Sequence, residues 1–274
     1  MPKITPSNFN YIRTLVADLS AIALGDEKTY LVEARLLPVA RRAGLSSIDD
    51  LVARLRTPNH SLRQQVVDAI TTNETSFFRD QVPFQMLRDT ILPDLVARRA
   101  DLKNLNIWSA ACASGQEPYS VAMLLAEHFS HLPDWRFRLL GTDLSADVLE
   151  RARGGRFTQL EIDRGLPEPL LKKYFRRVGT EWQLDETICR MVEFRQLNLS
   201  DSWPAVVKMD VILLRNVLVY FDAPTREDIL GKIRQVLRPD GYLLLGGAET
   251  ALHIDTAFKV TRRDGFSYYQ LDNG

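Results

Sequence analysis

One stretch, Ile107–Tyr119, constrains the fold of this chain more than any other. It reads Ile-Trp-Ser-Ala-Ala-Cys-Ala-Ser-Gly-Gln-Glu-Pro-Tyr. Its apolar start is typical of a buried strand, and Pro118 stands where the first turn of a helix tolerates a missing N–H. Between them, Ala110–Gly115 has almost no side-chain bulk, so a ligand can approach the backbone. A parallel sheet binds its ligand at such a strand-to-helix turn. The stretch therefore predicts a cofactor site in an α/β sheet.

The hydrophobic pattern changes along the chain. Up to about residue 80 it has only helical periodicity, and it predicts helices over 9–24, 29–43, from a capping box at Ser47 through Arg56, and from 61 onward. A connecting helix follows over 81–99. Strands then alternate with helices, with strands predicted at 105–110, 136–142, 192–197, 209–214 and 242–247, and helices at 118–130, 145–153 and 225–237. Such repeated strand–helix–strand units indicate a parallel sheet.

Two regions depart from this alternation. Residues 257–263 and 266–271, around Asp264 and Gly265, predict a terminal hairpin and hence an antiparallel edge. Residues 156–192 are less regular, with a short helix near 168–175 and small strands at 182–184 and 189–192. We therefore predict a helical domain over 1–70, a linker over 71–80 and an α/β domain over 81–274.

Composition narrows the possible functions. Lysine plus arginine and aspartate plus glutamate both count 35, so the net charge gives no sign of nucleic-acid binding. No apolar run approaches the roughly 18 residues of a membrane-spanning helix. Two cysteines and four histidines do not suggest a metal site. We expect a cytoplasmic monomer without a metal, nucleic-acid binding or membrane insertion.

The loop itself discriminates between cofactors. A dinucleotide-binding turn needs Gly-x-Gly-x-x-Gly, but this loop offers only Gly115, followed by Gln116 and Glu117. A carboxylate repels phosphates and suits a cationic ligand. S-adenosylmethionine carries an ammonium and a sulfonium and no phosphate. The alternative is that Glu117 only stabilises a helix N-terminus by its charge.

Other polar residues end the predicted strands. Asp143 stands 26 residues after Glu117 (143 − 117), where a nucleotide-binding fold places its acceptor for ribose hydroxyls, although it could simply cap a helix. Asn198 can donate and accept, as an adenine edge requires, but asparagine is also common in turns. The pairs Asn198-Leu199 and Arg215-Asn216 are expected at the same crevice.

The predicted linker has an unusual composition. Thr71–Arg79 is densely polar and contains two adjacent phenylalanines before its arginine. Such a segment could cover a cofactor and present Arg79 to it. The alternative is a plain linker.

Four motifs together resemble one family. They are Thr-Thr-Asn-x-Thr-x-Phe-Phe-Arg at 71–79, Ser-Gly-Gln-Glu-Pro-Tyr-Ser at 114–120, Gly-Thr-Asp-Leu-Ser at 141–145 and Arg-Asn-Val-Leu-Val-Tyr-Phe at 215–221. In order and spacing they are similar to those of the chemotaxis-receptor glutamate O-methyltransferases of the CheR type. The resemblance extends from about residue 9 to the end of the chain.

The resemblance implies a class I methyltransferase fold: a Rossmann-like, mostly parallel seven-stranded sheet, preceded by a small all-α domain and carrying a small β-subdomain at about 156–192. It implies S-adenosylmethionine as methyl donor, S-adenosylhomocysteine as product, and receptor glutamates as acceptors for sensory adaptation. Arg79 and Tyr220 would flank the transferred methyl. By motif position the cofactor-binding residues would be Asn73, Thr75, Arg79, Glu117, Asp143, Asn198, Leu199, Leu214, Arg215 and Asn216.

The chain departs from the family pattern at two points. Ala111 stands where many relatives have glycine, and the segment Arg177–Glu181 is short for members that bind a receptor's C-terminal peptide tether. Two other functions remain possible: an NAD-dependent oxidoreductase, which Glu117 and the missing glycines oppose, and a catalytically weak signalling adaptor that binds S-adenosylmethionine.

A basic helix face is a candidate receptor-docking surface. Lys28, Arg35 and Arg42 are spaced by seven and fall on nearly one helix face, and Arg41 lies beside them. Acidic receptor helices would be its partner. A solvated helix face is the alternative.

Overall fold

The computed structural model describes residues 4–203, 207–263 and 265–272. The chain divides into two compact units. The helical unit extends to Thr72 and includes Tyr220–Thr225, and the sheet unit comprises 73–219 and 226–274. The inclusion of Tyr220–Thr225 in the helical unit could not be expected from the sequence, because these residues follow the fourth predicted strand.

The helical unit is formed by α1 (Pro6–Ser20), η1 (Asp26–Lys28), α2 (Thr29–Arg42), α3 (Ile48–Leu55) and α4 (His60–Ile70). The hydroxyl of Ser47 accepts from the amide of Asp50, and Asn59 caps α4 in the same way. Such caps satisfy amides that the first helical turn leaves unpaired. All four predicted helices are present, and α1 ends at Ala21, in a left-handed conformation, rather than at residue 24.

One predicted docking residue has another use in this unit. The guanidinium of Arg35 donates to the carbonyls of Ile70 and Thr71 and to the hydroxyl of Thr72. It therefore satisfies carbonyls that the end of α4 leaves unpaired. Arg35 thus has a structural role in this unit, and its part in receptor docking stays a prediction.

The sheet unit contains seven strands in the order β6-β2-β1-β7-β8-β10-β9. The first five are parallel, and β10 is antiparallel to β8 and β9. Their bounds are β1 Asn104–Ala110, β2 Arg136–Asp143, β6 Val192–Gln196, β7 Met209–Leu214, β8 Leu237–Leu245, β9 Phe258–Arg263 and β10 Phe266–Leu271. The predicted fold class is confirmed, as is the terminal hairpin, although its turn residue Asp264 lies outside the described residues.

The strand order reverses between β1 and β7. Chain order runs outward to β2 and β6 on one side and to β7 and β8 on the other. Ligands of open α/β sheets bind at such a switch point, outside the carboxyl ends of the strands. The topology therefore selects the ends of β1 and β7, where Ile107–Tyr119 and Arg215 lie.

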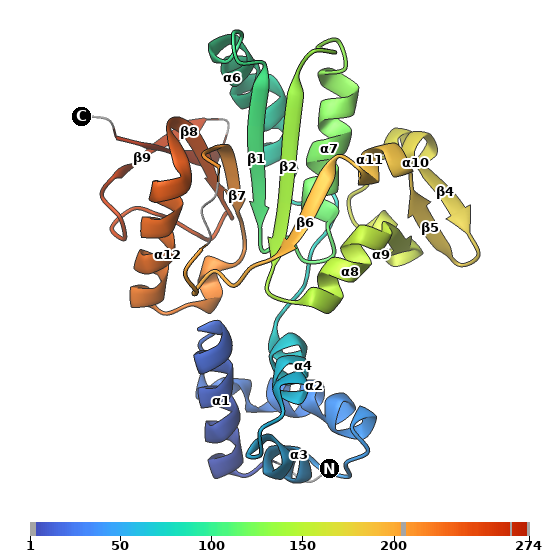
Figure 1. Ribbon diagram of the computed structural model, residues 1–274, viewed down its shortest axis with the longest axis vertical. Helices are drawn as coiled ribbons and strands as arrows, with labels where there is room; N and C mark the ends of the chain where they lie inside the picture. Colours follow the sequence, from blue (N-terminus) through green and yellow to red (C-terminus); the bar gives the residue numbers. More distant parts are fainter. Residues whose placement is uncertain (1–3, 204–206, 264, 273–274) are drawn as a thin grey trace. The chain divides into compact units, whose positions relative to one another are not determined.

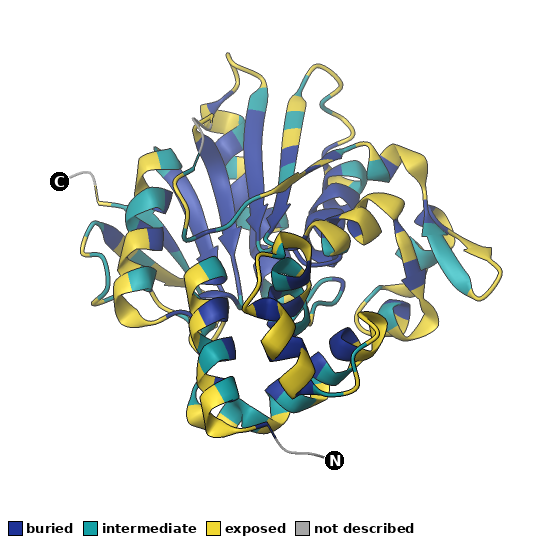
Figure 2. Cartoon of the chain, turned by 60° about the horizontal axis from the view of Figure 1, so that its bottom comes forward, coloured by how far each residue is buried: buried dark blue, intermediate teal, exposed yellow. Residues whose placement is uncertain are grey.

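Apolar side chains cover both faces of the sheet. Helices α7 (Gln116–His128) and α8 (Ala146–Gly154) pack on β1, β2 and β6, and the central strands are buried along most of their length (Figure 2). Helix α12 (Ala223–Val236) lies on the other face, beside β7 (Figure 1). The ring of Trp203 meets that of Trp108 edge-on, with 5.1 Å between the ring centroids, and Lys232 of α12 lies over Trp203. The site loop thus stands on a rigid, doubly covered layer.

The connecting helix is interrupted. It consists of α5 (Val82–Met86), a π-helical turn (Leu87–Ile91) and α6 (Leu92–Arg98). Pro93 has no N–H to donate to residue 89, and the amide of Leu92 instead bonds to Leu87. The missing donor explains the wider turn.

The insertion between β2 and β6 contains the small subdomain. Strands β3 (Arg156–Thr158), β5 (Glu181–Leu184) and β4 (Phe175–Val178) form a separate antiparallel sheet, with α9 (Gln159–Asp163), α10 (Glu168–Tyr174) and α11 (Glu186–Cys189) around it. The predicted strand at 182–184 is confirmed. The one at 189–192 is wrong, because Asp185 caps α11 through the amide of Thr187 and the next strand begins only at Val192.

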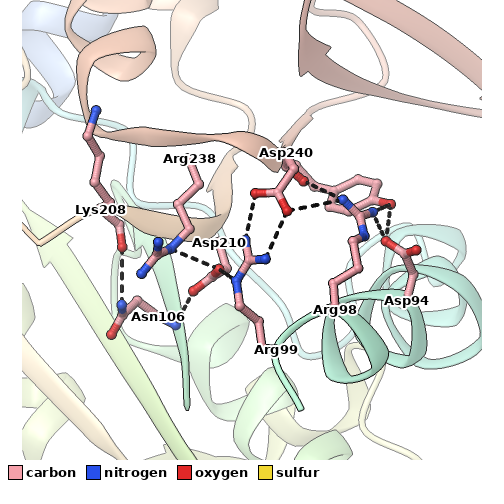
Figure 3. Close-up of polar contacts among 9 residues, drawn as sticks. Asp94, Arg98, Arg99, Asn106, Lys208, Asp210, Arg238 and Asp240 are labelled. Atoms are coloured by element: carbon pink, nitrogen blue, oxygen red, sulfur yellow. Dashed lines mark hydrogen bonds and ion pairs between the residues drawn. The ribbon is translucent and has the colours of Figure 1, made fainter. Parts of the chain in front are cut away.

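A buried ionic network holds the amino edge of the sheet, opposite the site (Figure 3). The Asp210 side chain has 0% exposure. It accepts from the Arg99 side chain at 3.0 Å and from the Asn106 amide at 2.9 Å. Arg99 also forms two hydrogen bonds with Asp240, which hold the pKa of that carboxyl below its usual value. Strand β8 bulges here, since Met209 pairs with Leu237 but Val211 pairs with Tyr242. The ion pairs fill the bulge.

Substitution Asp210→Ala should lower the free energy of unfolding of the sheet unit by about 3–5 kcal/mol, because it leaves a buried cation partly unpaired. All four tryptophans lie in this unit, so fluorescence in urea reports its unfolding. The control is Asp134→Ala, which removes an exposed 3.4 Å pair with Lys103 and should change stability by less than about 0.5 kcal/mol. Equal effects of the two substitutions would contradict the assigned role of Asp210.

Candidate functional site

The loop after β1 has an unusual backbone. Ala111, Ala113 and Gly115 all have positive φ, at 54°, 48° and 91°. Alternate left-handed residues curl the chain tightly, and for alanine this conformation costs on the order of 1 kcal/mol. A Cβ on Gly115 would lie 3.1 Å from Tyr119 and from Ala152. Ala111 thus occupies a position whose backbone favours glycine.

Glu117 is buried at the start of α7. One oxygen of its carboxylate accepts from the Ser109 hydroxyl at 2.7 Å, and the other pairs with Arg215 at 2.7 Å. By sequence alone, Glu117 is an isolated negative charge that rejects phosphates. In the structure Arg215 compensates that charge, so repulsion by Glu117 does not by itself exclude a ligand with phosphates. Any ligand at the loop meets an ion pair.

Arg215, directly after β7, is the centre of the site. Its side chain is only 1% exposed. Besides Glu117, it donates to the carbonyl of Arg79 at 2.9 Å and to the Asp80 carboxylate at 2.7 Å. One buried cation therefore joins the end of β7, the start of α7 and the segment that follows the helical unit. Truncating such a residue leaves buried acceptors without a partner.

The segment that carries Arg79 is a strained turn. Phe78, Asp80 and Gln81 have positive φ values of 48°, 67° and 50°. Non-glycine residues keep such angles only where the surroundings enforce them, and they cluster at functional sites. The enforcing contact on one side of Arg79 is the Arg215 clamp. The side chain of Arg79 donates to the carbonyl of Glu74.

Two aromatic residues anchor the other side of the turn. Phe77 is fully buried against Phe157 and Phe175 of the small subdomain. The amide of Phe78 donates to the Ser120 hydroxyl of α7 at 2.9 Å. The turn is therefore rigidly held, which favours the predicted role for the junction over a plain linker.

Asp143 closes the site at the end of β2. Its carboxylate accepts from the amides of Ala113 and Ser145, at 2.9 and 3.0 Å. Burial raises its pKa above the usual range of an aspartate, partly offset by these amides. Asp143 both shapes the loop and offers oxygen lone pairs beside it. The alternative that Asp143 caps the next helix is wrong, because the Ser145 hydroxyl caps α8 by accepting from the amide of Val148. The role of hydroxyl acceptor stays a prediction.

Asn198 is engaged in a turn. Its side-chain oxygen accepts from the amide of Ser200, and its nitrogen donates to Asp201. These contacts are those of a turn residue, which was the alternative to adenine binding. Even so, it borders a cavity of about 220 Å³ that Trp108 and Thr142 also line. Leu199 is buried, and its carbonyl accepts from Lys232.

The remaining predicted residues differ in their placement. Leu214 is completely buried at the end of β7, and Asn216 is left-handed with φ 59°. Asn73 and Thr75 are half-buried in the extended segment before the strained turn. Tyr220 belongs to the helical unit, where its carbonyl accepts a hydrogen bond from the amide of Ala23. The sheet unit thus brings together Arg79, Glu117, Asp143 and Arg215.

Two residues that contact the site were not predicted from the sequence. Asp80 is a partner of Arg215 and follows the junction motif directly. Glu249 lies after β8, and its carboxylate accepts from four backbone amides, those of Asn216, Val217, Leu218 and Gly246. The only signal for Glu249 was the pair Gly246-Gly247 at the end of a predicted strand.

The described residues contain no group of three or more His, Cys, Asp or Glu side chains that could hold a metal ion. No helix in that part of the chain is long and apolar enough to cross a bilayer.

Comparison with known proteins decides the family. Residues 73–266 match the family "CheR methyltransferase, SAM binding domain", and residues 7–71 match its "all-alpha domain". The chain belongs to the CheR methyltransferase family. It is 39% identical to chemotaxis protein methyltransferase 1 of Pseudomonas aeruginosa over 93% of this chain and 94% of that protein. It is 40% identical to chemotaxis protein methyltransferase Cher2 of Pseudomonas putida over 88% and 90% of the two chains.

This CheR-family chain is therefore an S-adenosylmethionine-dependent methyltransferase of chemotaxis. The resemblance, the enzyme class and the cofactor expected from the sequence are confirmed. The alternative of an NAD-dependent oxidoreductase is wrong. The site residues stay predictions.

Substitution Glu117→Gln should weaken S-adenosylmethionine binding at least about tenfold, or 1.4 kcal/mol. It keeps the size of the side chain but removes one of the two carboxylates paired with Arg215, so less negative charge faces a cationic ligand. Isothermal titration calorimetry measures the affinity. Glu150→Gln, on an exposed position of α8, is the matched control. Unchanged affinity in both variants would remove Glu117 from the cofactor site.

Proposed function

We propose that the chain transfers a methyl group from S-adenosylmethionine to glutamate side chains of chemoreceptor cytoplasmic helices, as part of sensory adaptation. The observation that carries this proposal is the clamped turn, in which Arg215 joins Arg79 and Asp80 to Glu117 within a methyltransferase domain of the CheR family. The acceptor would be cytoplasmic, so we propose that the enzyme acts in the cytoplasm.

The residues at the carboxyl edge fit the cofactor. The small residues of the loop let a ligand approach the backbone, and Asp143 offers carboxylate oxygens to hydroxyls. Glu117 and Asp80 outnumber the single Arg215 cation that they share, so the clamp retains a negative charge toward a cationic ligand. Asn73, Thr75, Asn198, Leu199, Leu214 and Asn216 would complete the cofactor site.

The reaction requires little acid–base chemistry from the protein. When bound, S-adenosylmethionine supplies an electrophilic methyl group, which the acceptor carboxylate oxygen takes as a methyl ester while the C–S electron pair stays on the sulfur of S-adenosylhomocysteine. A glutamate, with a reference pKa of about 4.3, is already ionised near neutral pH, so no general base is needed. The role of the chain is to position the acceptor carboxylate in line with the methyl group and to remove water from it. Each turnover removes one negative charge from the receptor.

Arg79 is the residue suited to hold the acceptor carboxylate. A guanidinium binds a carboxylate through paired hydrogen bonds, and the rigid turn limits its freedom before the acceptor arrives. Tyr220, which the family motif also supplies, would flank the methyl. We therefore expect substitutions of Arg79 and Tyr220 to lower kcat.

Substitution Arg79→Ala should reduce kcat about 100-fold or more and change S-adenosylmethionine affinity much less, because Arg79 would act on the acceptor. Transfer of radiolabelled methyl to a panel of receptor cytoplasmic fragments measures the former, and calorimetry the latter. Arg88→Ala, which removes an exposed pair with Asp89, is the control. Equal losses of kcat and affinity would refute the assignment, and no transfer to any fragment by the wild type would favour the adaptor alternative.

The docking proposal rests on the remaining basic residues. Arg41 and Arg42 are exposed in the last turn of α2, and Lys28 is half-buried before it. Acidic receptor helices are their proposed partner. Cations at a helix C-terminus are also stabilised by the helix dipole, so exposure alone does not decide between the two explanations.

The double charge reversal Arg41→Glu/Arg42→Glu should raise KM for receptor fragments about tenfold at low ionic strength and less at high salt, with kcat nearly unchanged. Steady-state methylation at two salt concentrations tests this. The control is Arg13→Glu, which reverses one charge on α1 of the same unit. An equal KM for the two variants would remove α2 as the docking surface.

A further inference from the structure

The carboxylate of Glu249 fills an anion-binding backbone concavity. Three successive amides, those of Asn216, Val217 and Leu218, converge on it at 2.7–2.8 Å, and the amide of Gly246 adds a fourth bond at 2.8 Å. Successive backbone N–H groups around a left-handed residue form such anion sites. Here Asn216 is that residue, with φ 59°, and a side chain of the same chain is the anion.

The contact joins two strand ends at the site. Residues 216–218 follow β7, and Glu249 follows β8, its parallel neighbour. Close approach is required for this contact, since a Cβ on Gly246 would lie 2.7 Å from the Glu249 carboxylate and 2.9 Å from the Asn216 nitrogen. A carboxylate that accepts several N–H groups forms short, strong hydrogen bonds. The backbone after Arg215 is therefore fixed by Glu249.

Two different anchors thus hold the segment that leaves β7. Arg215 is held through its side chain by Glu117 and Asp80, at the cofactor loop. The following three residues are held through their backbone by Glu249, and the chain then continues as η3 (Leu218–Tyr220). Loss of the second anchor leaves the first in place. Of the predicted cofactor residues only Asn216 is held by the second anchor, so loss of that anchor should affect the residues that lead to Tyr220 more than cofactor binding.

We propose that Glu249 is a positioning residue for methyl transfer, which fixes the backbone of Asn216–Leu218 and thereby the segment that leads to Tyr220. This rests on the proposed function, in which Tyr220 flanks the transferred methyl. Glu249 does not touch the reacting atoms. It acts by holding the acceptor-side segment while the Arg215 clamp holds the cofactor side.

The test compares two glycines. Gly246→Ala forces the carboxylate and the Asn216 amide apart without removing Glu249, whereas a Cβ on Gly247 would meet nothing within 4 Å. We expect Gly246→Ala and Glu249→Gln to lower kcat at least tenfold and to change the Kd of S-adenosylmethionine less than threefold. Gly247→Ala and the exposed Glu227→Gln should behave as wild type.

Two further readouts separate positioning from simple loss of stability. Formate, but not chloride at equal ionic strength, should restore part of kcat in Glu249→Ala, because a small carboxylate can occupy the four amides. Hydrogen exchange of the amides of 216–218 and Gly246 should be faster in Glu249→Gln than in Glu227→Gln.

The outcomes distinguish the two proposals. Equal losses of kcat and cofactor affinity, or a wild-type kcat in Gly246→Ala and Glu249→Gln, would overturn the role of Glu249. If the wild type methylates no receptor fragment, the proposed function fails. Unchanged exchange at the four amides would then overturn the fixing of the segment independently of activity.

Discussion

The site depends on one buried cation. The guanidinium of Arg215 pairs with Glu117 and Asp80 and donates to the carbonyl of Arg79, with almost no exposure to water. In a low-dielectric environment such a charge is stable only if every partner is in place. The positions of the first turn of α7, the strained turn and the end of β7 are therefore determined together. A substitution at any of these partners should therefore displace the others.

The sheet supports this arrangement from two edges. At its amino edge the network around Asp210 stabilises the bulge of β8. At its carboxyl edge Glu249 fixes the loop after β7 through four amides. Between these edges the central strands β1 and β7 are buried along nearly their whole length. Polar side chains at the edges, rather than the core, set the shape of the site.

Some elements around this site were predicted from the sequence and others were not. Long periodic segments such as α7 and β7 were predicted because their patterns are strong. The strands at 156–158 and 175–178 were missed, since a strand of three or four residues gives too short a pattern to recognise. The structural role of Arg35 was missed for another reason: helical spacing shows which face a residue shares, but not that its guanidinium binds the carbonyls at the end of α4.

The sequence by itself determined the fold class and the family, because four motifs in order and the alternation of strands and helices are properties of the chain alone. Only the tertiary structure decided how the charges are used. Glu117 and Arg215 are 98 residues apart, and Glu249 is 33 residues from Asn216. No local pattern records such pairings, since they arise only when parallel strands bring their carboxyl ends to one edge. The loop at Ala111–Gly115 is therefore evident in the sequence, whereas the ion pair that completes it is evident only in the fold.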